Sequence, residues 1–327
     1  MSKWPALACM VLALLWPPAV MAEADAAFPA RALRFVVPIA PGSSGDTLTR
    51  SFAEALRAQS GRATVVENRP GADLVIGTQH VVASPADGYS LLLVSNSSLV
   101  INPVFLKDLP YKADDLLPLI ELTRSPAVLV TGNGSRLQSF GDLLDAARRA
   151  PGKVSVGVYG NSYRLGLLDL ARRAGVSFNV IPYKGAGQAV SDAAGGNVDV
   201  VLLDLGGALP LVQGGKVRAL AIAAEQRHAA LPALPTVKES GVPDYTLYVF
   251  IGLAVHAKTP PAVLERLDAL LQQTMARPGL REQMQRQSGA EISGQGRQAF
   301  AATIAAENAR VREVLRTAGP DALADKP

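Results

Sequence analysis

Residues 33–50, with the sequence LRFVVPIAPGSSGDTLTR, join an apolar strand to an amphipathic helix through a loop rich in proline, glycine and serine. The run at residues 33–37 predicts a buried strand. Gly42 and Gly45 allow backbone angles and close approaches that other residues resist, and Asp46 is predicted to be the N-cap of the following helix. This order of elements predicts an α/β fold. The unit is either an ordinary turn or a site where backbone N–H groups and a helix dipole bind an anion.

The N-terminal segment has the pattern of a secretory signal peptide. Lys3 supplies a basic start, residues 6–15 form an apolar core too short to span a membrane, and Ala22 ends a small-residue cleavage site. We therefore expect residues 1–22 to be removed and the mature chain to work in the periplasm. The single cysteine, Cys9, falls in this segment, so we expect no disulfide and no thiolate chemistry.

The composition of the whole chain is that of an ordinary globular protein. Hydrophobic residues make up 49% and charged residues 18% of the chain, and the formal net charge is +4. No basic stripe is interleaved with aromatic residues, so nucleic acid is not an expected partner. The length suggests two domains of ordinary size.

Strand and helix patterns alternate along the chain. Apolar runs predict further strands at residues 63–67, 90–94, 127–130, 154–158, 178–181, 198–203 and 217–223. Ser139 and Asp142 form a capping-box pattern for a helix at residues 140–150, and a last helix is predicted at residues 297–317. Alternating units of this kind predict mostly parallel sheets with helices on both faces. Ligands of such folds lie beyond the carboxyl ends of the strands.

Patterns typical of enzymes are weak in this sequence. The three histidines, His80, His228 and His256, are far apart and lack metal-ligand spacing. A glycine pattern that begins at Gly185 has Val190 where a dinucleotide-binding motif needs a third glycine. We expect neither an enzyme nor a bound metal or cofactor.

Short motifs run in order along the mature chain. They are VVPIAPGSSGD at residues 36–46, ENRPGA at 67–72, DGY at 87–89, PYKG at 182–185, GKVRALA at 215–221 and LPT at 234–236. Together they resemble the Bug family, the periplasmic solute-binding components of tripartite tricarboxylate transporters. The resemblance covers nearly the whole mature chain.

The resemblance implies an α/β, bilobal periplasmic binding protein of the type II-like class. Two parallel-rich sheets flanked by helices would be joined by hinge crossings near residues 125–128 and 247–251. Lobe 1 would hold residues 31–127 and 249–327, and lobe 2 residues 128–248. The lobes of a monomer would close on a small organic anion, a mono-, di- or tricarboxylate. The protein would deliver this anion to inner-membrane permease subunits or, alternatively, report it to a membrane sensor without a transport role.

The same resemblance implies where the ligand binds. In the family, the loop after the first strand and the PYKG loop hold ligand carboxylates. Carried over, these contacts are Gly42, Ser43, Ser44, Asp46, Tyr183, Lys184, Gly185 and Ala186. Further candidates follow other predicted strands: Ser95, Tyr159, Asn161, Ser162, Arg164 and Asp204.

Several residues depart from the family pattern or have a second interpretation. Ser43 replaces a glycine and would be strained at a positive φ, and Asp73 with the following leucine replaces a Gly-Gly pair. The loop at residues 160–165 is two residues shorter than usual. Its Arg164 is either a bidentate carboxylate clamp, which would favour a second acidic group, or an exposed helix residue. Asp204 would repel an anion unless an ammonium group or water intervenes.

Overall fold

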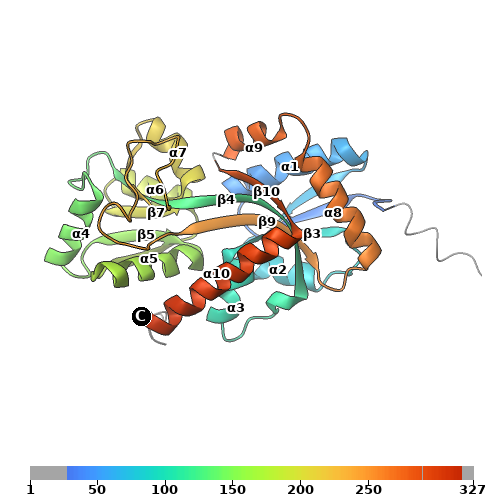
Figure 1. Cartoon of the computed structure of the whole chain (residues 1–327), viewed down its shortest axis with the longest axis horizontal. Coiled ribbons are helices and arrows are strands. Elements are labelled where there is room, and N and C mark those ends of the chain that lie inside the picture. Colours follow the sequence, from blue (N-terminus) through green and yellow to red (C-terminus); the bar gives the residue numbers. More distant parts are fainter. Residues whose placement is uncertain (1–27, 289, 319–327) are drawn as a thin grey trace, which may run out of the picture.

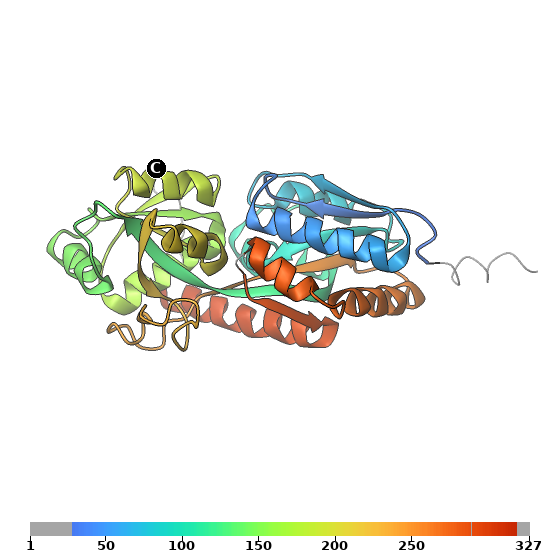
Figure 2. The same cartoon turned by 90° about the horizontal axis from the view of Figure 1, so that it is seen from above.

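The computed structural model describes residues 28–288 and 290–318. The expected signal peptide, residues 1–22, lies outside them. Two lobes lie side by side along the long axis of the molecule and are connected by two long strands (Figures 1 and 2). Within the described ranges, no helix is both long and apolar enough to cross a membrane.

Lobe 1 is a three-layer unit in which helices cover both faces of a sheet. Its strands are β1 (Leu33–Val37), β2 (Thr64–Asn68), β3 (Ser90–Ser95), β9 (Tyr248–His256), β10 (Ile292–Gly296) and the first part of β4 (Leu116–Gly132). Its helices are α1 (Ser44–Ser60), α2 (Val75–Val82), the π-helix η2 (Ser97–Ile101), α3 (Asn102–Phe105), the short η3 (Ala113–Asp115), α8 (Pro261–Met275), α9 (Leu280–Ser288) and α10 (Arg297–Ala318). Strand β1 is parallel to β2 and β3, and β9 runs antiparallel between β3 and β4.

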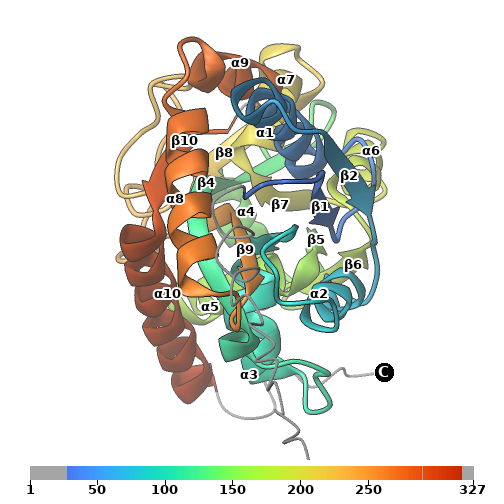
Figure 3. The same ribbon diagram turned by 90° about the vertical axis from the view of Figure 1, so that its right-hand side faces the viewer.

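Successive side chains along the lobe 1 strands point to opposite faces of the sheet, which explains why helices cover both faces. Phe35 packs in a core with α1, α8 and α9, whereas its neighbour Val36 packs in a second core on the other face with α2, η2 and α10. Figure 3 shows α1 beside α8 and α9. Apart from the exposed Arg34, the first strand is apolar, because Leu33 and residues 35–37 are buried on its two faces.

Lobe 2 repeats this arrangement with its own sheet. Its strands are the second part of β4, β5 (Ser155–Tyr159), β6 (Asn179–Tyr183), β7 (Val200–Asp204) and β8 (Val217–Ile222). Its helices are α4 (Phe140–Arg149), α5 (Gly160–Ala174), α6 (Ala186–Ala194) and α7 (Leu205–Gln213). Strand β5 is parallel to β6 and β7, while β4 is antiparallel to β7 and β8.

The connection between the lobes runs through β4 and β9. Strand β4 pairs with β9 as far as Pro126, opposite Tyr248, and with β7 from Ala127, opposite Asp204. Helix α10 lies across both lobes (Figure 2), and its Val311 shares a core with Leu165 of α5. On β4 the change of pairing partner therefore falls between Pro126 and Ala127.

Local details correct three expectations. The N-cap of α1 is Ser43, not Asp46, because the Ser43 side chain accepts the Asp46 N–H. Ser43 has a φ of −68° and carries no strain of the expected kind; the positive φ, +79°, belongs to Gly42. The predicted parallel units form the outer part of each sheet, and the sequence patterns did not show that β4 and β9 pair antiparallel at the centre.

Candidate functional site

The loop between β1 and α1 is held in shape by Asp46. Its Oδ2 accepts the Gly42 N–H at 2.8 Å and the Arg50 Nε–H at 3.0 Å. Its Oδ1 accepts from Asn68 Nδ2 at 2.8 Å, which ties the loop to β2. The Asp46 side chain is only 3% exposed. Asp46 therefore anchors the loop between β1 and α1.

Electrostatics at Asp46 favour the charged form. Burial acts to raise its pKa, but the hydrogen bonds from Arg50, Gly42 and Asn68 outweigh burial and hold the pKa below its ordinary value. Because the carboxylate stays ionised at neutral pH, its three hydrogen bonds are charge-assisted.

Helix α1 starts with two backbone donors that its own cap does not use. The Asp46 N–H donates to Ser43 Oγ at 3.3 Å, and the Thr47 N–H donates to the Ser43 carbonyl at 2.9 Å. The N–H groups of Ser44 and Gly45 precede these in the first turn, where amides have no acceptor within their helix. Gly45 packs closely, since a Cβ there would lie 2.8 Å from Ile39 Cδ1 and would require that side-chain end to shift. The first turn of α1 thus begins with neutral N–H groups that have no acceptor within their own helix.

In the PYKG loop, the tyrosine hydroxyl is already used in a hydrogen bond within the protein, so the remaining candidate donors of the loop are its backbone N–H groups. The Tyr183 hydroxyl donates to Asp192 at 2.8 Å, and burial together with this carboxylate raises the pKa of Tyr183 to about 12. Lys184 is exposed. Helix α6 begins after Gly185, which provides no side-chain cap, so Ala186 lies in a first turn whose amides are not capped by a side chain.

The ends of β5 and β7 bring two tyrosines and a carboxylate together. The Tyr159 hydroxyl donates to Asp204 at 2.8 Å and the Tyr163 hydroxyl at 3.4 Å, while the two rings lie 4.5 Å apart. Asp204 also accepts the Gly207 N–H at 2.8 Å and so caps α7. Burial and the Asp204 charge raise the pKa of both tyrosines well above the ordinary value. Both hydroxyls therefore remain protonated donors.

Other predicted residues lie where the lobes touch. Ser162 Oγ lies 3.1 Å from Ser97 Oγ of lobe 1, and the Asn161 N–H donates to Asp73 at 3.1 Å. Arg164 is half-buried one turn further along α5, and Ser95 is half-buried at the end of β3. The sequence motifs did not identify Asp73 as a site residue. The one signal was its replacement of a family Gly-Gly pair.

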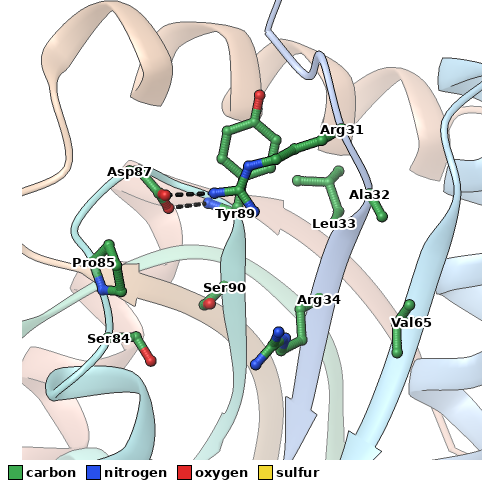
Figure 4. Close-up of a pocket in the computed structure, with 10 residues that line it drawn as sticks. All are labelled: Arg31, Ala32, Leu33, Arg34, Val65, Ser84, Pro85, Asp87, Tyr89 and Ser90. Atoms are coloured by element: carbon green, nitrogen blue, oxygen red, sulfur yellow. Dashed lines mark hydrogen bonds and ion pairs between the residues drawn. The ribbon is translucent and has the colours of Figure 1, made fainter.

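Two cavities in the described part of the chain lie away from these residues. A cavity of about 390 Å³ lies at the far end of lobe 1 (Figure 4), where Arg31 stacks 3.9 Å from the centre of the Tyr89 ring and pairs with Asp87 at 2.6 Å. A cavity of about 140 Å³ lies beside the hinge next to Tyr248. Because Arg31 already pairs with Asp87, and Arg34 of the same cavity pairs with Glu67 at 3.6 Å, we assign no anion to it. No cluster of three metal-ligating side chains occurs among the described residues.

Proteins of known family are similar to this chain along most of its length. The family described as tripartite tricarboxylate transporter family receptor matches residues 48–319. BugT of Bordetella pertussis is 35% identical over 245 residues, which cover 74% of this chain and 75% of BugT. The structure of R. palustris Rpa4515 with adipate is 28% identical with a TM-score of 0.83, covering 89% of this chain and 98% of that chain.

The periplasmic binding protein BugD is also similar in structure. It is 29% identical with a TM-score of 0.80, covering 89% of this chain and 99% of that chain. The predicted resemblance to the Bug family is thereby confirmed, and so is the predicted two-lobed α/β fold of periplasmic binding proteins.

Proposed function

This chain belongs to the tripartite tricarboxylate transporter receptor family, and we propose that it captures a small carboxylate-bearing organic anion between its two lobes. It then delivers the anion to a membrane permease of the tripartite tricarboxylate type. The observation that carries this proposal is the start of α1, where Ser43 and Asp46 fix the loop and leave the Ser44 and Gly45 amides as neutral donors. The similar protein Rpa4515, solved with adipate, supports a carboxylate as the ligand.

Binding in this proposal involves no chemistry on the ligand. The protein acts as a periplasmic monomer, and its lobes, residues 31–127 with 249–327 and residues 128–248, close by hinge motion at the β4–β9 connection. The start of α1 supplies donors from lobe 1, and the start of α6, at Gly185 and Ala186, supplies donors from lobe 2. Backbone donors at helix starts favour anions over neutral sugars and cations.

Recovery of the ligand tests the function directly. Protein purified from the periplasm is washed, denatured and examined by mass spectrometry. We expect a carboxylic acid to be released, to rebind as the intact compound, and to make the protein more compact in small-angle scattering. Conversion of the compound into a product, or binding confined to neutral sugars, would overturn the proposal.

Arg164 provides a further test of the site. As a ligand contact, its guanidinium would hold a carboxylate bidentately. If Arg164 makes this contact, Arg164→Ala weakens carboxylate binding by roughly 1.5–3 kcal/mol, the range for hydrogen bonds to charged groups. Arg164→Lys should recover only part of this loss, because an ammonium lacks the planar fork. If Arg164 is a helix residue that does not reach the ligand, Arg164→Ala binds like the parent. Calorimetry with one ligand measures all three proteins, and equal affinities would place Arg164 outside the site.

A further inference from the structure

Asp73 reaches from lobe 1 to the first turn of a lobe 2 helix. It lies between β2 and α2 with a φ of +47°, and its Oδ2 accepts the Asn161 N–H of α5 at 3.1 Å. Gly160 has a φ of +75°, and a Cβ there would lie 3.1 Å from Asp73 Oδ1. A side chain at position 160 would therefore crowd the carboxylate.

The donors that hold the Asp73 carboxylate are neutral. Besides the Asn161 amide, the Ser97 hydroxyl hydrogen-bonds to it, and burial raises the pKa of Asp73. Asn102 supports the same contact, since its Nδ2 donates to the Asp73 carbonyl at 2.7 Å and its Oδ1 accepts from Asn161 Nδ2 at 3.2 Å. A protein carboxylate thus occupies the start of α5 without a cation among these partners.

A second carboxylate stands at the same edge of the lobe 2 sheet. Asp204 ends β7 and is bonded to Tyr159, the residue before Gly160. Strands β5 and β7 are parallel neighbours, so their carboxyl ends share an edge. The carboxyl groups of Asp73 and Asp204 thus hydrogen-bond to the residues on either side of Gly160, at the start of α5.

We propose that Asp73 is a specificity-determining residue, because it fills the start of α5 with the protein's own carboxylate and so selects ligands that carry a single carboxylate. The inference rests on the proposed function, in which the starts of α1 and α6 bind that carboxylate. The other end of the ligand is neutral or cationic. A dicarboxylate would have to displace Asp73 or place a second charge beside it, and like charges in a partly buried site repel strongly. This preference for ligands with one carboxylate is opposite to the preference for a second acidic group that an Arg164 clamp alone would give.

Calorimetry with matched ligands tests this inference. Adipate is compared with its half-amide, adipamate, and succinate with succinamate, so that each pair differs by one charge at nearly constant shape. We expect the parent protein to bind each half-amide at least about tenfold more tightly than the diacid. In Asp73→Asn the ratio of half-amide to diacid affinity should fall by about tenfold or more. The substitution removes the charge of residue 73, while its side-chain amide oxygen still accepts the Asn161 N–H. Asparagine also tolerates the left-handed backbone of position 73.

The control is Asp87→Asn, which removes a carboxylate at the far end of lobe 1 (Figure 4) and should keep the parental ratio. If Asp73 had a purely structural role, Asp73→Asn would weaken binding of the diacid and of its half-amide by the same factor. The inference fails, and the proposed function stands, if the parent binds the diacids as tightly as the half-amides or if Asp73→Asn leaves the ratio unchanged. Absence of binding to every carboxylate tested overturns both. If Asp73→Asn does not fold, the ratio of half-amide to diacid affinity in the parent protein alone decides whether the inference holds.

Discussion

Asn96→Ala should lower the free energy of unfolding by about 3–5 kcal/mol, because it leaves one buried and one partly buried backbone group at the hinge without their Asn96 partner. Asn96 is 1% exposed. Its Oδ1 accepts the Phe250 N–H at 2.8 Å, and its Nδ2 donates to the Tyr248 carbonyl at 3.1 Å. Its side chain thus extends the β3–β9 pairing beyond the last strand pair, Ser95 with Ile251.

Denaturant unfolding monitored by circular dichroism measures this effect. Asn96→Asp keeps an acceptor for the Phe250 N–H but loses the donor, so its stability should fall between those of the parent and the alanine variant. Asn197→Ala, at an exposed position, should change stability by no more than about 0.5 kcal/mol. A loss of less than about 1 kcal/mol for Asn96→Ala would show that the hinge does not depend on this side chain.

Asp46→Ala should lower the free energy of unfolding by about 2–4 kcal/mol at neutral pH, since it removes three hydrogen bonds to a buried carboxylate. The released Gly42 loop would also lose the geometry of the Ser44 and Gly45 amides, so we expect carboxylate affinity to fall at least about tenfold. Denaturant unfolding and calorimetry measure the two effects. Asp145→Ala, whose side chain is 58% exposed, is the control. An Asp46→Ala protein that binds ligand like the parent would show that the amides do not hold it.

The contribution of Asp46 to the free energy of unfolding is expected to decrease as the pH falls. Because the folded pKa is depressed, the stabilisation is fully present above the unfolded pKa and is lost as the pH falls through the folded value. The stability difference between the parent and Asp46→Asn should therefore narrow below about pH 4. A difference that stays constant down to pH 2 would contradict the assigned hydrogen bonds.

Local sequence signals predicted the elements that depend on near neighbours. The capping box at Ser139 is present, with the Asp142 N–H donating to Ser139 Oγ at 3.1 Å, because its partners lie three residues apart. The apolar runs at β3 and β7 formed strands because two core layers bury both of their faces. The N-cap of α1 was predicted at Asp46 and is Ser43, three residues earlier, since either residue type can cap a helix.

The remaining features depend on contacts between distant residues. Antiparallel pairing of β4 with β9 joins segments more than a hundred residues apart, and no local pattern specifies it. The motif places Tyr183 in the PYKG loop, but only the fold shows that its hydroxyl is used by Asp192. Likewise, Asp73 gains its position against Asn161 only when the two lobes meet. Sequence motifs thus indicated where the loops lie, whereas only the tertiary structure shows which of their polar atoms are already used in hydrogen bonds within the protein.

Thermal unfolding with adipamate and with adipamide tests the central claim most directly. The two compounds have nearly the same shape, and only adipamate carries a carboxylate. Because a ligand that binds the folded state stabilises it by mass action, adipamate should raise the melting temperature in proportion to the logarithm of its concentration. Adipamide should leave the melting temperature unchanged. An equal rise with both compounds would contradict carboxylate recognition by the helix-start amides.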